Sequence, residues 1–329
     1  MWKIGNVIIN SRVVLASMSG ITNVYYRQFL KSFGVGYSVT EMVNVRSIVN
    51  NNKKIATLLR MSKIDRPVAI QLFGDNIDIT LKAISIIESK LAKQYDILDI
   101  NLACPVKKII RSKSGVFWMK NINNLIAYIK EIVKFSKKPV TVKLRLGFDT
   151  PIDMVDLATK LEKIGVAAIA IHARTGKQLY SGNANFEAIK DLGKKITVPL
   201  VVSGDIFTLS DAIKAVKITS ATAVMVARGG LGNPFLIKQI NNFFNKNAKL
   251  KLPTLYDQIL YCQKLFDFFI KHEEQKKVIF LIKRIAPYFF KNFCNASNVR
   301  SFLTQRINTI DEFKNFLIFM KKGVKNGEY

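Results

Sequence analysis

One cysteine in the sequence stands where a thiol could do chemistry. Cys104 lies in segment 99–105, DINLACP, three residues after Asn101. A thiol with an ordinary pKa of roughly 8.5 is mostly protonated at pH 7, so Cys104 could donate a proton as a general acid, or attack as a nucleophile if activated. No histidine lies near it in the sequence. Both roles therefore stay open, beside the structural alternative of a small buried side chain, which we favour for Cys262 and Cys294.

Two cations and a histidine follow other apolar runs. Lys143 and Arg145 alternate with Val142 and Leu144, so both point to the same side of a strand. Two cations on the inner side of a sheet are costly unless they meet an anion or an electron-rich ligand. The apolar residues around them argue against a surface pair. His172 ends another apolar run, where it is either structural or functional.

Two glycine-containing segments are suited to binding a phosphate. The first is ARGGLGNP at 227–234, and the second is Ser203-Gly204-Asp205. Glycine lets backbone amides approach a phosphate closely, and a helix N-terminus is expected after the first segment. Each segment alone is also consistent with an ordinary turn. Together, after the last two strands of a barrel, they predict a phosphate site.

These residues are positioned by eight short apolar runs, each followed by a stretch with helical spacing. The runs are continuous rather than alternating, as expected for strands covered on both faces. This α/β pattern predicts a closed (β/α)8 TIM barrel. A doubly wound open sheet is the alternative, but the first run is followed by 19–22, SGIT, and not by a GxGxxG turn. The predicted strands are 13–18, 37–42, 67–73, 95–101, 139–146, 167–173, 199–205 and 223–228.

The chain changes character after about Asn247. Helical spacing predicts helices at 254–272, 274–293, 296–304 and 308–322, and the polar run 245–247 with Pro253 marks a boundary. We therefore predict a catalytic barrel over 1–247, followed by a small C-terminal α-helical bundle domain over 248–329.

In a TIM barrel, reactive side chains lie at the carboxyl ends of the strands. A single polar residue at such an end usually reflects local solvation, but polar ends on six or more strands predict a common pocket. The residues at these ends are Met18, Glu41, Gln71, Asn101, Lys143, Arg145, His172, Ser203, Asp205 and Arg228.

The composition, 49% hydrophobic and 22% charged, is that of a globular chain and excludes one that is mostly disordered. The formal net charge is +28. This charge suggests a polyanionic partner, although its nearly even spread along the chain fits a solvated lysine-rich surface equally well. With no membrane-length apolar run, no signal-peptide core and three widely spaced cysteines, we expect a cytoplasmic protein with reduced thiols and no zinc site.

A set of motifs occurs in a specific order along the chain: ASMSGITN at 16–23, TEMV at 40–43, AIQLFG at 69–74, DINLACPVKK at 99–108, VKLRLG at 142–147, IHARTGKQLYSG at 171–182, SGDI at 203–206 and ARGGLGNP at 227–234. With this order the chain resembles the tRNA-dihydrouridine synthases, and within them the bacterial B-type branch. The resemblance is dense from Ile4 to Phe235 and looser in the tail. The chain departs from the family at Ser17, usually proline, at Ala103, usually glycine, at Ser203, usually asparagine, and in the bulky segment 114–118.

The resemblance implies a flavin enzyme that reduces the C5–C6 double bond of particular uridines in tRNA, with NADPH or NADH as reductant. It implies that Cys104 is the proton donor, with Asn101, Arg145 and Tyr180 around the target uracil. It also implies a helical domain that recognises tRNA, and a monomer without a protein partner suffices for this chemistry. The implied FMN contacts are Met18, Gln71, Lys143, His172, Ser203, Gly204, Asp205, Ala227, Arg228 and Gly229.

On this interpretation, hydride passes from the reduced flavin to C6 of uracil and Cys104 protonates C5 from the opposite face, while Lys143 stabilises the anionic reduced flavin. In the tail, we expect Lys277, Lys283, Arg284, Lys291 and Arg300 to contact the RNA backbone. Two other functions stay open. A flavin barrel acting on a free pyrimidine would leave the basic tail without a purpose. An RNA-binding module without catalysis would leave Cys104, in its ring of polar strand ends, unexplained.

Overall fold

The computed structural model describes residues 1–246, 250–291 and 295–326. It consists of two compact units, Met1–Ala227 and Arg228–Tyr329. The predicted domain boundary after Asn247 falls on residues 247–249, outside the described residues, and the division between the units comes earlier in the chain. The limits of the two functional domains therefore stay a prediction.

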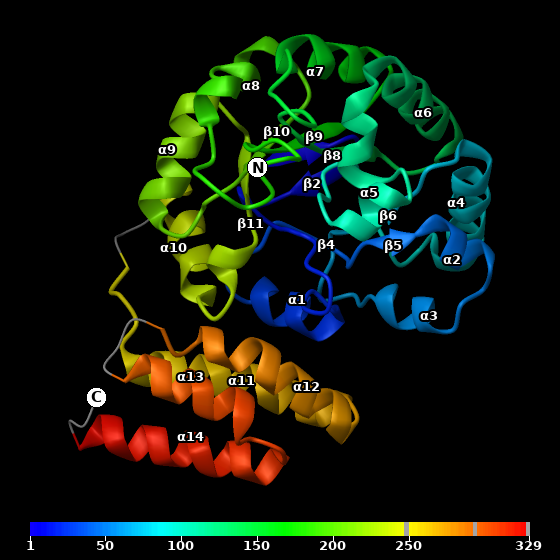
Figure 1. Ribbon diagram of the computed structural model, residues 1–329. Helices are drawn as coiled ribbons and strands as arrows, with labels where there is room; N and C mark the ends of the chain where they lie inside the picture. The colour runs from blue at the N-terminus through cyan, green and yellow to red at the C-terminus, as the bar shows by residue number, and fades with distance from the viewer. Residues whose placement is uncertain (247–249, 292–294, 327–329) are drawn as a thin grey trace. The chain divides into compact units, whose positions relative to one another are not determined.

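Parallel strands in the first unit close into a barrel, which confirms the predicted (β/α)8 fold (Figure 1). Each strand pairs with the next in the chain, and the last pairs with the first. All are short and almost completely buried, because helices cover one side and the barrel interior the other. The barrel strands are β3 (Val13–Leu15), β4 (Tyr37–Val39), β6 (Val68–Phe73), β7 (Ile97–Asn101), β8 (Val140–Arg145), β9 (Ala168–His172), β10 (Leu200–Ser203) and β11 (Ala223–Val226).

Several of these strands end before the predicted positions. Strand β3 ends at Leu15 and β10 at Ser203, so Met18 and Asp205 lie in the loops that follow the strands. Loops at this end of a barrel can place their side chains over the strand ends. The shorter strands therefore leave the predicted site residues at the carboxyl end of the barrel.

Helices surround the barrel on the outside (Figure 1). Their N-termini carry the side-chain caps that such helices need: Asn76 accepts a hydrogen bond from the Ile79 N–H, and Thr208 forms a capping box with Asp211. The helices of the first unit are α1 (Val24–Lys31), α2 (Val45–Val49), α3 (Lys54–Leu58), α4 (Ile77–Leu91), α5 (Lys107–Arg111), α6 (Ile122–Phe135), α7 (Met154–Lys163), α8 (Leu192–Lys195) and α9 (Leu209–Thr219), with short 3-10 turns η1 (Gly115–Lys120) and η2 (Phe186–Ile189).

An N-terminal hairpin, which the sequence analysis did not predict, precedes the barrel. Strands β1 (Trp2–Ile4) and β2 (Val7–Ile9) pair antiparallel. Ile4 and Ile9 are fully buried in one cluster with Val14, Tyr37 and Ile97 from the barrel strands. The hairpin thus packs against the interior at the amino ends of the strands. A short strand β5 (Val43–Asn44), also not predicted, pairs with β6.

The second unit is helical in its described part. Aromatic side chains form its core; Phe266 meets Phe313 edge-on, with ring centroids 5.1 Å apart, and Phe290 meets Phe316 at 5.3 Å. Cys262 is fully buried, as expected, and Cys294 lies outside the described residues. The elements are η3 (Arg228–Gly230), α10 (Pro234–Phe244), α11 (Leu255–His272), α12 (Gln275–Ile285), η4 (Ala286–Tyr288), α13 (Ala296–Gln305) and α14 (Ile310–Lys325).

A helix that could cross a membrane needs a long apolar stretch, and none of the helices in the described ranges has one.

Candidate active site

The strand register brings the predicted polar residues of the barrel side by side. Neighbouring strands place their last residues next to one another, so the polar ends form a continuous arc at one end of the barrel. The register pairs are Gln71 with Asp99, Asn101 with Lys143, Arg145 with His172 and His172 with Ser203.

A buried chain of hydrogen bonds runs along three of these strands. Asp99 accepts a hydrogen bond from the Thr141 hydroxyl at Oδ1 and one from Gln71 Nε2 at Oδ2, each 2.6 Å long. The other end of the Gln71 amide, Oε1, accepts from Asn101 Nδ2 at 2.8 Å. Burial raises the pKa of Asp99, while the two donors and Lys143 act in the opposite direction. The chain fixes the orientation of both amides, because each amide oxygen meets donors and each amide nitrogen meets acceptors.

The same chain of bonds holds the cysteine loop. Asn101 Oδ1 accepts from the backbone N–H groups of Ala103 and Cys104, at 3.1 and 2.9 Å. The Cys104 carbonyl accepts from Val116 N at 3.1 Å, and a Cβ on Gly115 would lie only 2.7 Å from that carbonyl oxygen. Gly115 also has φ +62, which favours glycine. The loop that carries the thiol is therefore anchored at both of its ends.

The environment of the Cys104 thiol favours its protonated form. Burial is the largest influence and raises its pKa, against smaller opposite effects of the Val106 backbone N–H, Arg145 and Lys143. The thiol is only partly buried, so it is accessible. A thiol that keeps its proton at neutral pH is suited to donating it, whereas a thiolate nucleophile needs a lowered pKa.

Lys143 is a partly buried cation on β8. Burial and the neighbouring Arg145 lower its pKa to about 8, against the attraction of Asp99 and Cys104. No hydrogen bond or ion pair joins its ammonium group to another residue within the described ranges. Such a group is costly without an electron-rich partner. Lys143 therefore remains a cation without such a partner among the described residues, and its contact with a ligand stays a prediction.

Arg145 is 1% exposed, and its guanidinium donates hydrogen bonds to backbone carbonyls of the same chain. Nε donates to the Ala103 carbonyl at 2.9 Å, and Nη1 donates to the carbonyls of Thr175 and Leu179 at 2.6 and 2.7 Å. Its carbon Cζ lies 5.4 Å from the centre of the Tyr180 ring, which is 53% exposed. The structure thus satisfies this inward cation with backbone carbonyls, which the sequence analysis did not consider, and Arg145 ties the cysteine loop to the loop after β9.

His172 is held by Arg174, a residue that the sequence analysis did not select. Arg174 is 2% exposed; its Nη1 lies 3.3 Å from His172 Nε2, and its Nη2 donates to Asp205 Oδ2 at 2.6 Å. Asp205 Oδ2 also accepts from the Ala184 N–H at 2.8 Å. Arg174 follows His172 by two residues, and this spacing is the signal that could have identified it. The arrangement fixes the imidazole and the loop after β10 together.

The predicted phosphate segment after β10 has tight backbone geometry. Gly204 has φ +119, and a Cβ there would lie 2.9 Å from Ala184 Cβ and 3.4 Å from the His172 ring. Only glycine fits this position without a shift of its neighbours. Ser203, where the family usually has asparagine, is 4% exposed.

The loop after β3 is also closed by internal bonds. The Met18 carbonyl accepts from Ile21 N and Thr22 N, both at 3.0 Å, and the Gly20 N–H donates to the Glu41 carboxylate. Met18 is thereby fixed in the loop after β3.

Segment 227–234, which the sequence predicts to bind a phosphate, spans the division between the two units. Ala227 is the last residue of the first unit, and Arg228 and Gly229 lie in η3 of the second. Their part in a site with the other predicted residues stays a prediction. Within the second unit, this segment packs closely on η4, since a Cβ on Gly232 would lie 2.1 Å from the Tyr288 carbonyl carbon.

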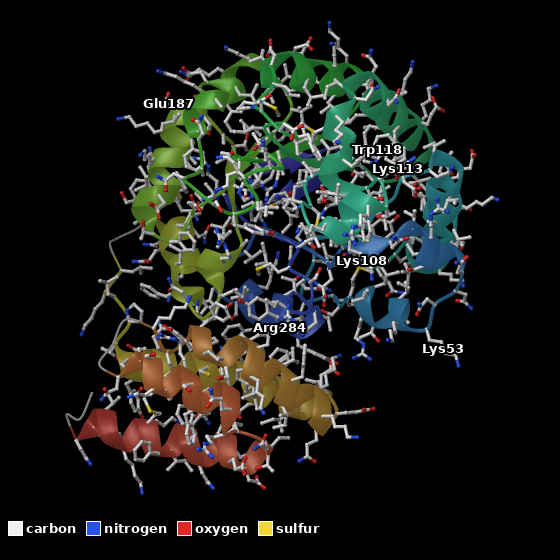
Figure 2. The ribbon with its side chains drawn as sticks, in the orientation of Figure 1. Lys53, Lys108, Lys113, Trp118, Glu187 and Arg284 are labelled. Atoms are coloured by element: carbon white, nitrogen blue, oxygen red, sulfur yellow. The ribbon has the colours of Figure 1, made fainter. Side chains whose placement is uncertain are left out.

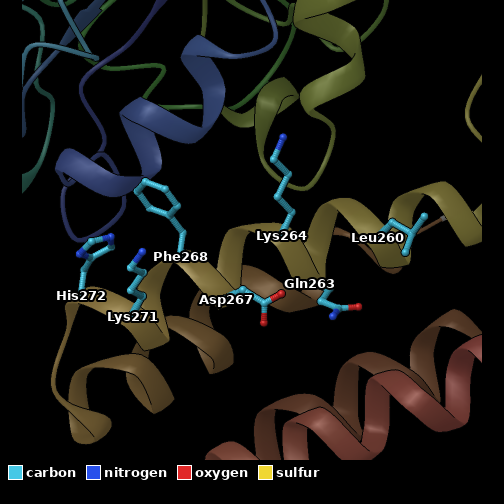
Figure 3. A pocket seen from close by; sticks show the side chains of 7 residues that line it. All are labelled: Leu260, Gln263, Lys264, Asp267, Phe268, Lys271 and His272. Atoms are coloured by element: carbon cyan, nitrogen blue, oxygen red, sulfur yellow. The ribbon is translucent and has the colours of Figure 1, made fainter.

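The helical unit carries its own surface features. A pocket of 470 Å³ lies along α11, where Lys264 and Lys271 alternate with apolar side chains (Figure 3). His272, which we expected to be an exposed helical residue, is exposed there, with its ring 5.1 Å from that of Phe268.

The five cations predicted to contact RNA largely have partners within this unit. Lys277 pairs with Glu273, Lys283 donates to Asn308, Arg300 donates to the Phe290 carbonyl, and Lys291 and Arg284 lie over the rings of Tyr288 and Phe280. Their contact with RNA stays a prediction.

A flavin would fit the donor set of the first unit. Lys143 offers, for an electron-rich ring edge, a cation without a hydrogen-bond or ion-pair partner among the described residues, and Gly204 lets the backbone after β10 lie close to Ala184 and His172. Gln71 and Asn101 present amides of fixed orientation nearby. These features match the chemistry of a polar, anionic ring system with a phosphate.

Comparison with known proteins agrees with the geometry. The family model described as dihydrouridine synthase (Dus) matches residues 14–324. "Probable tRNA-dihydrouridine synthase 1" of Synechocystis sp. is 31% identical over 317 residues, covering 96% of this chain and 88% of that protein. "tRNA-dihydrouridine synthase B" of Pasteurella multocida is 28% identical over 272 residues, covering 81% of each.

Among solved structures, histamine dehydrogenase from Rhizobium sp. 4-9 matches with a TM-score of 0.52 at 14% identity, over 83% of this chain and 50% of that one. At this identity the likeness concerns the fold.

Proposed function

Because the chain belongs to the dihydrouridine synthase family, we propose that it reduces the C5–C6 double bond of particular uridines in tRNA to 5,6-dihydrouridine. The observation that carries the proposal is the Cys104 thiol, which is accessible, keeps its proton through burial, and sits in a loop anchored by Asn101 and Val116. Saturating a double bond requires one hydride and one proton, and in this proposal the thiol supplies the proton.

FMN is the proposed cofactor, with NADPH or NADH as the reductant. When bound, the flavin would supply the hydride to C6 of uracil. Lys143 would hold the electron-rich edge of the flavin ring, where its positive charge favours the reduced anionic form. Gly204, where a side chain would crowd Ala184, would offer its backbone to the phosphate, and His172, fixed by Arg174, would line the same side. Met18, Gln71, Ser203, Asp205, Ala227, Arg228 and Gly229 complete the proposed FMN contacts.

The protein's own groups carry the other half of the reaction. Cys104 Sγ gives its proton to C5 as hydride arrives at C6, and the resulting thiolate is stabilised by the nearby cations Arg145 and Lys143. Asn101 and Tyr180 would orient the uracil. Arg145 acts mainly on the loops, because its bonds to carbonyls hold the thiol and the Tyr180 segment at a fixed separation. A base inside a helix cannot reach the thiol, so the uridine must leave its stack.

The decisive experiment compares tRNA with free uracil as electron acceptor for the purified, flavin-loaded protein. We expect flavin absorption bands, bleaching by NADPH or NADH, and dihydrouridine formed in tRNA lacking the modification. Cys104→Ala should keep the bound flavin and its reduction while dihydrouridine formation falls about 100-fold or more, the usual contribution of a positioned general acid. Cys262→Ala, which removes a buried thiol in the helical unit, is the matched control.

Three results would contradict the proposal. Near-normal product from Cys104→Ala would remove the proton-donor assignment. Turnover of free uracil but not of tRNA would favour a pyrimidine reductase. A colourless protein that binds tRNA without turnover would favour an RNA-binding module without catalysis.

A further inference from the structure

The segment that follows the reactive cysteine is basic. Between Asp99 and Glu131 the chain contains six Lys and Arg residues and no Asp or Glu. Other stretches without Asp or Glu are as rich in cations, with five Lys and Arg in 42–64 and seven in 275–310, so the feature that distinguishes this one is its position directly after the cysteine loop. The segment includes α5 and η1, which directly follow the Cys104 loop.

Four cations of this segment are exposed and unpaired. Lys107, Lys108, Arg111 and Lys113 are all exposed, and none has an ion pair or hydrogen bond from its side chain to a residue of the described ranges. Figure 2 shows Lys108 and Lys113 on this part of the chain. Of the other exposed cations in the barrel unit, some, such as Arg46, have a carboxylate partner, and others, such as Lys195, have none among the described residues.

Elsewhere in the same unit, some arginines and lysines are paired with carboxylates. Arg46 pairs with Asp75 at 2.8 Å, and Lys160 pairs with Asp156 at 2.7 Å. The four cations after Cys104 have no such partner, so their charge is available to an external anion.

The segment is tied to the thiol at both ends. Lys107 follows Cys104 by three residues, which limits their Cα separation to about 11 Å. At the other end, Lys113 precedes Gly115 by two residues, and the Gly115 Cα is packed against the Cys104 carbonyl. The bond from Val116 N to Cys104 O closes the loop. The backbone that carries the four cations is therefore tied to the backbone of Cys104 at both ends.

We propose that Lys107, Lys108, Arg111 and Lys113 bind phosphates of the RNA strand next to the uridine that reaches Cys104. The inference rests on the proposed function and adds a binding surface to it. A uridine that leaves its stack brings its flanking phosphates with it, and a strand held there has a row of anions within reach of these side chains. Val106, 50% exposed at the start of α5, offers apolar contact between the thiol and the cations.

The test replaces all four cations with glutamine, K107Q/K108Q/R111Q/K113Q, in the full-length protein. The matched control is K137Q/K163Q/K195Q/K217Q, which removes the same charge from exposed lysines that precede β8, β9, β10 and β11, at the opposite end of the barrel. Binding of tRNA is measured against salt concentration for wild type and both variants. Flavin content and reduction by NADPH are recorded as checks of folding.

A cation that contacts a phosphate contributes about 0.7 to 0.9 to the slope of log affinity against log salt. We expect the slope of the first variant to fall by about 3, with a loss of affinity of about 10-fold or more at low salt. Its KM for tRNA should rise while flavin reduction by NADPH is unchanged. The control should keep the wild-type slope to within about one contact.

Equal slopes and equal KM values for the two variants would overturn the inference, even if wild type forms dihydrouridine normally. A reduced slope for the first variant alone supports it, also in a preparation in which wild type forms no dihydrouridine. In that case the phosphate-binding surface is supported and the proposed reduction of uridine is contradicted, so the experiment distinguishes the two proposals.

Discussion

Replacing Gln71 with glutamate tests the hydrogen-bond chain that anchors the cysteine loop. The Gln71 side chain is fully buried, and its Nε2 donates to Asp99 Oδ2 over 2.6 Å. In Gln71→Glu, two carboxylates would meet at this distance away from water. They cannot both be ionised there, so the pair must retain one proton. Once protonated, the introduced carboxyl group can donate to Asp99 and still accept from Asn101, which preserves the geometry.

The cost of holding this proton follows from linkage. An unfolded glutamate has a pKa of about 4.3, and each pH unit above that value costs about 1.36 kcal/mol as long as the folded pair stays protonated. The variant should therefore lose about 3.7 kcal/mol of unfolding free energy at pH 7 and about 1 kcal/mol at pH 5. The folded pKa is raised above the unfolded one, so stability is retained at low pH and lost as pH rises.

The assay is urea unfolding of wild type and variant between pH 4.5 and 7.5, taking the difference at each pH. Gln94→Glu, at an exposed position after α4, is the matched control and should differ from wild type by less than about 0.5 kcal/mol at every pH. A Gln71→Glu penalty that does not change with pH would refute the reasoning. It would mean that Asp99 already carries a proton and is not the carboxylate that accepts from Gln71.

Three further changes test other parts of the site. Lys143→Met should weaken flavin retention yet stabilise the flavin-free protein at pH 7, because the lowered pKa marks a penalised cation; the gain in unfolding free energy should shrink as pH rises from about 8 towards the unfolded value of about 10.4. Arg145→Met leaves three carbonyls without their donor and should cost about 3 kcal/mol or more, measured by urea unfolding, with partial recovery in Arg145→Lys. Gly204→Ala places a Cβ 2.9 Å from Ala184 at φ +119 and should cost about 1 to 3 kcal/mol and reduce the flavin content of the purified protein.

The barrel could be predicted because its strands are short, apolar on both faces and separated by amphipathic helices. Each predicted strand overlaps an observed one, although Met18 and Asp205 lie beyond the strand ends. The hairpin of β1 and β2 was missed. Its three-residue strands bury only alternate side chains such as Ile4 and Ile9, a pattern too short to stand out from a loop.

The positions of the candidate site residues followed from the rule that barrel sites lie at strand ends, but their bonding did not. Nothing in the sequence shows that Asp99 joins Thr141 to Gln71, because these contacts join three separate strands. The backbone carbonyls that satisfy Arg145 come from loops whose conformations depend on the fold. The periodicity of apolar residues predicts the face of a strand on which a side chain lies. It does not predict the hydrogen-bond partner of that side chain.

The N-terminal hairpin closes the barrel at the amino ends of its strands. Ile4 and Ile9 fill the interior at the amino ends of the strands, so in the described part of the first unit we expect ligands to reach the polar arc from the carboxyl ends. On the proposed function, NADPH or NADH and the target uridine of tRNA would then enter the same opening at the carboxyl ends of the strands, one after the other. Turnover would divide into two half-reactions, and the oxidised dinucleotide would leave before tRNA binds. A high concentration of either the dinucleotide or tRNA would slow the reaction by occupying the opening. Initial rates measured over a grid of both concentrations should accordingly give parallel reciprocal plots.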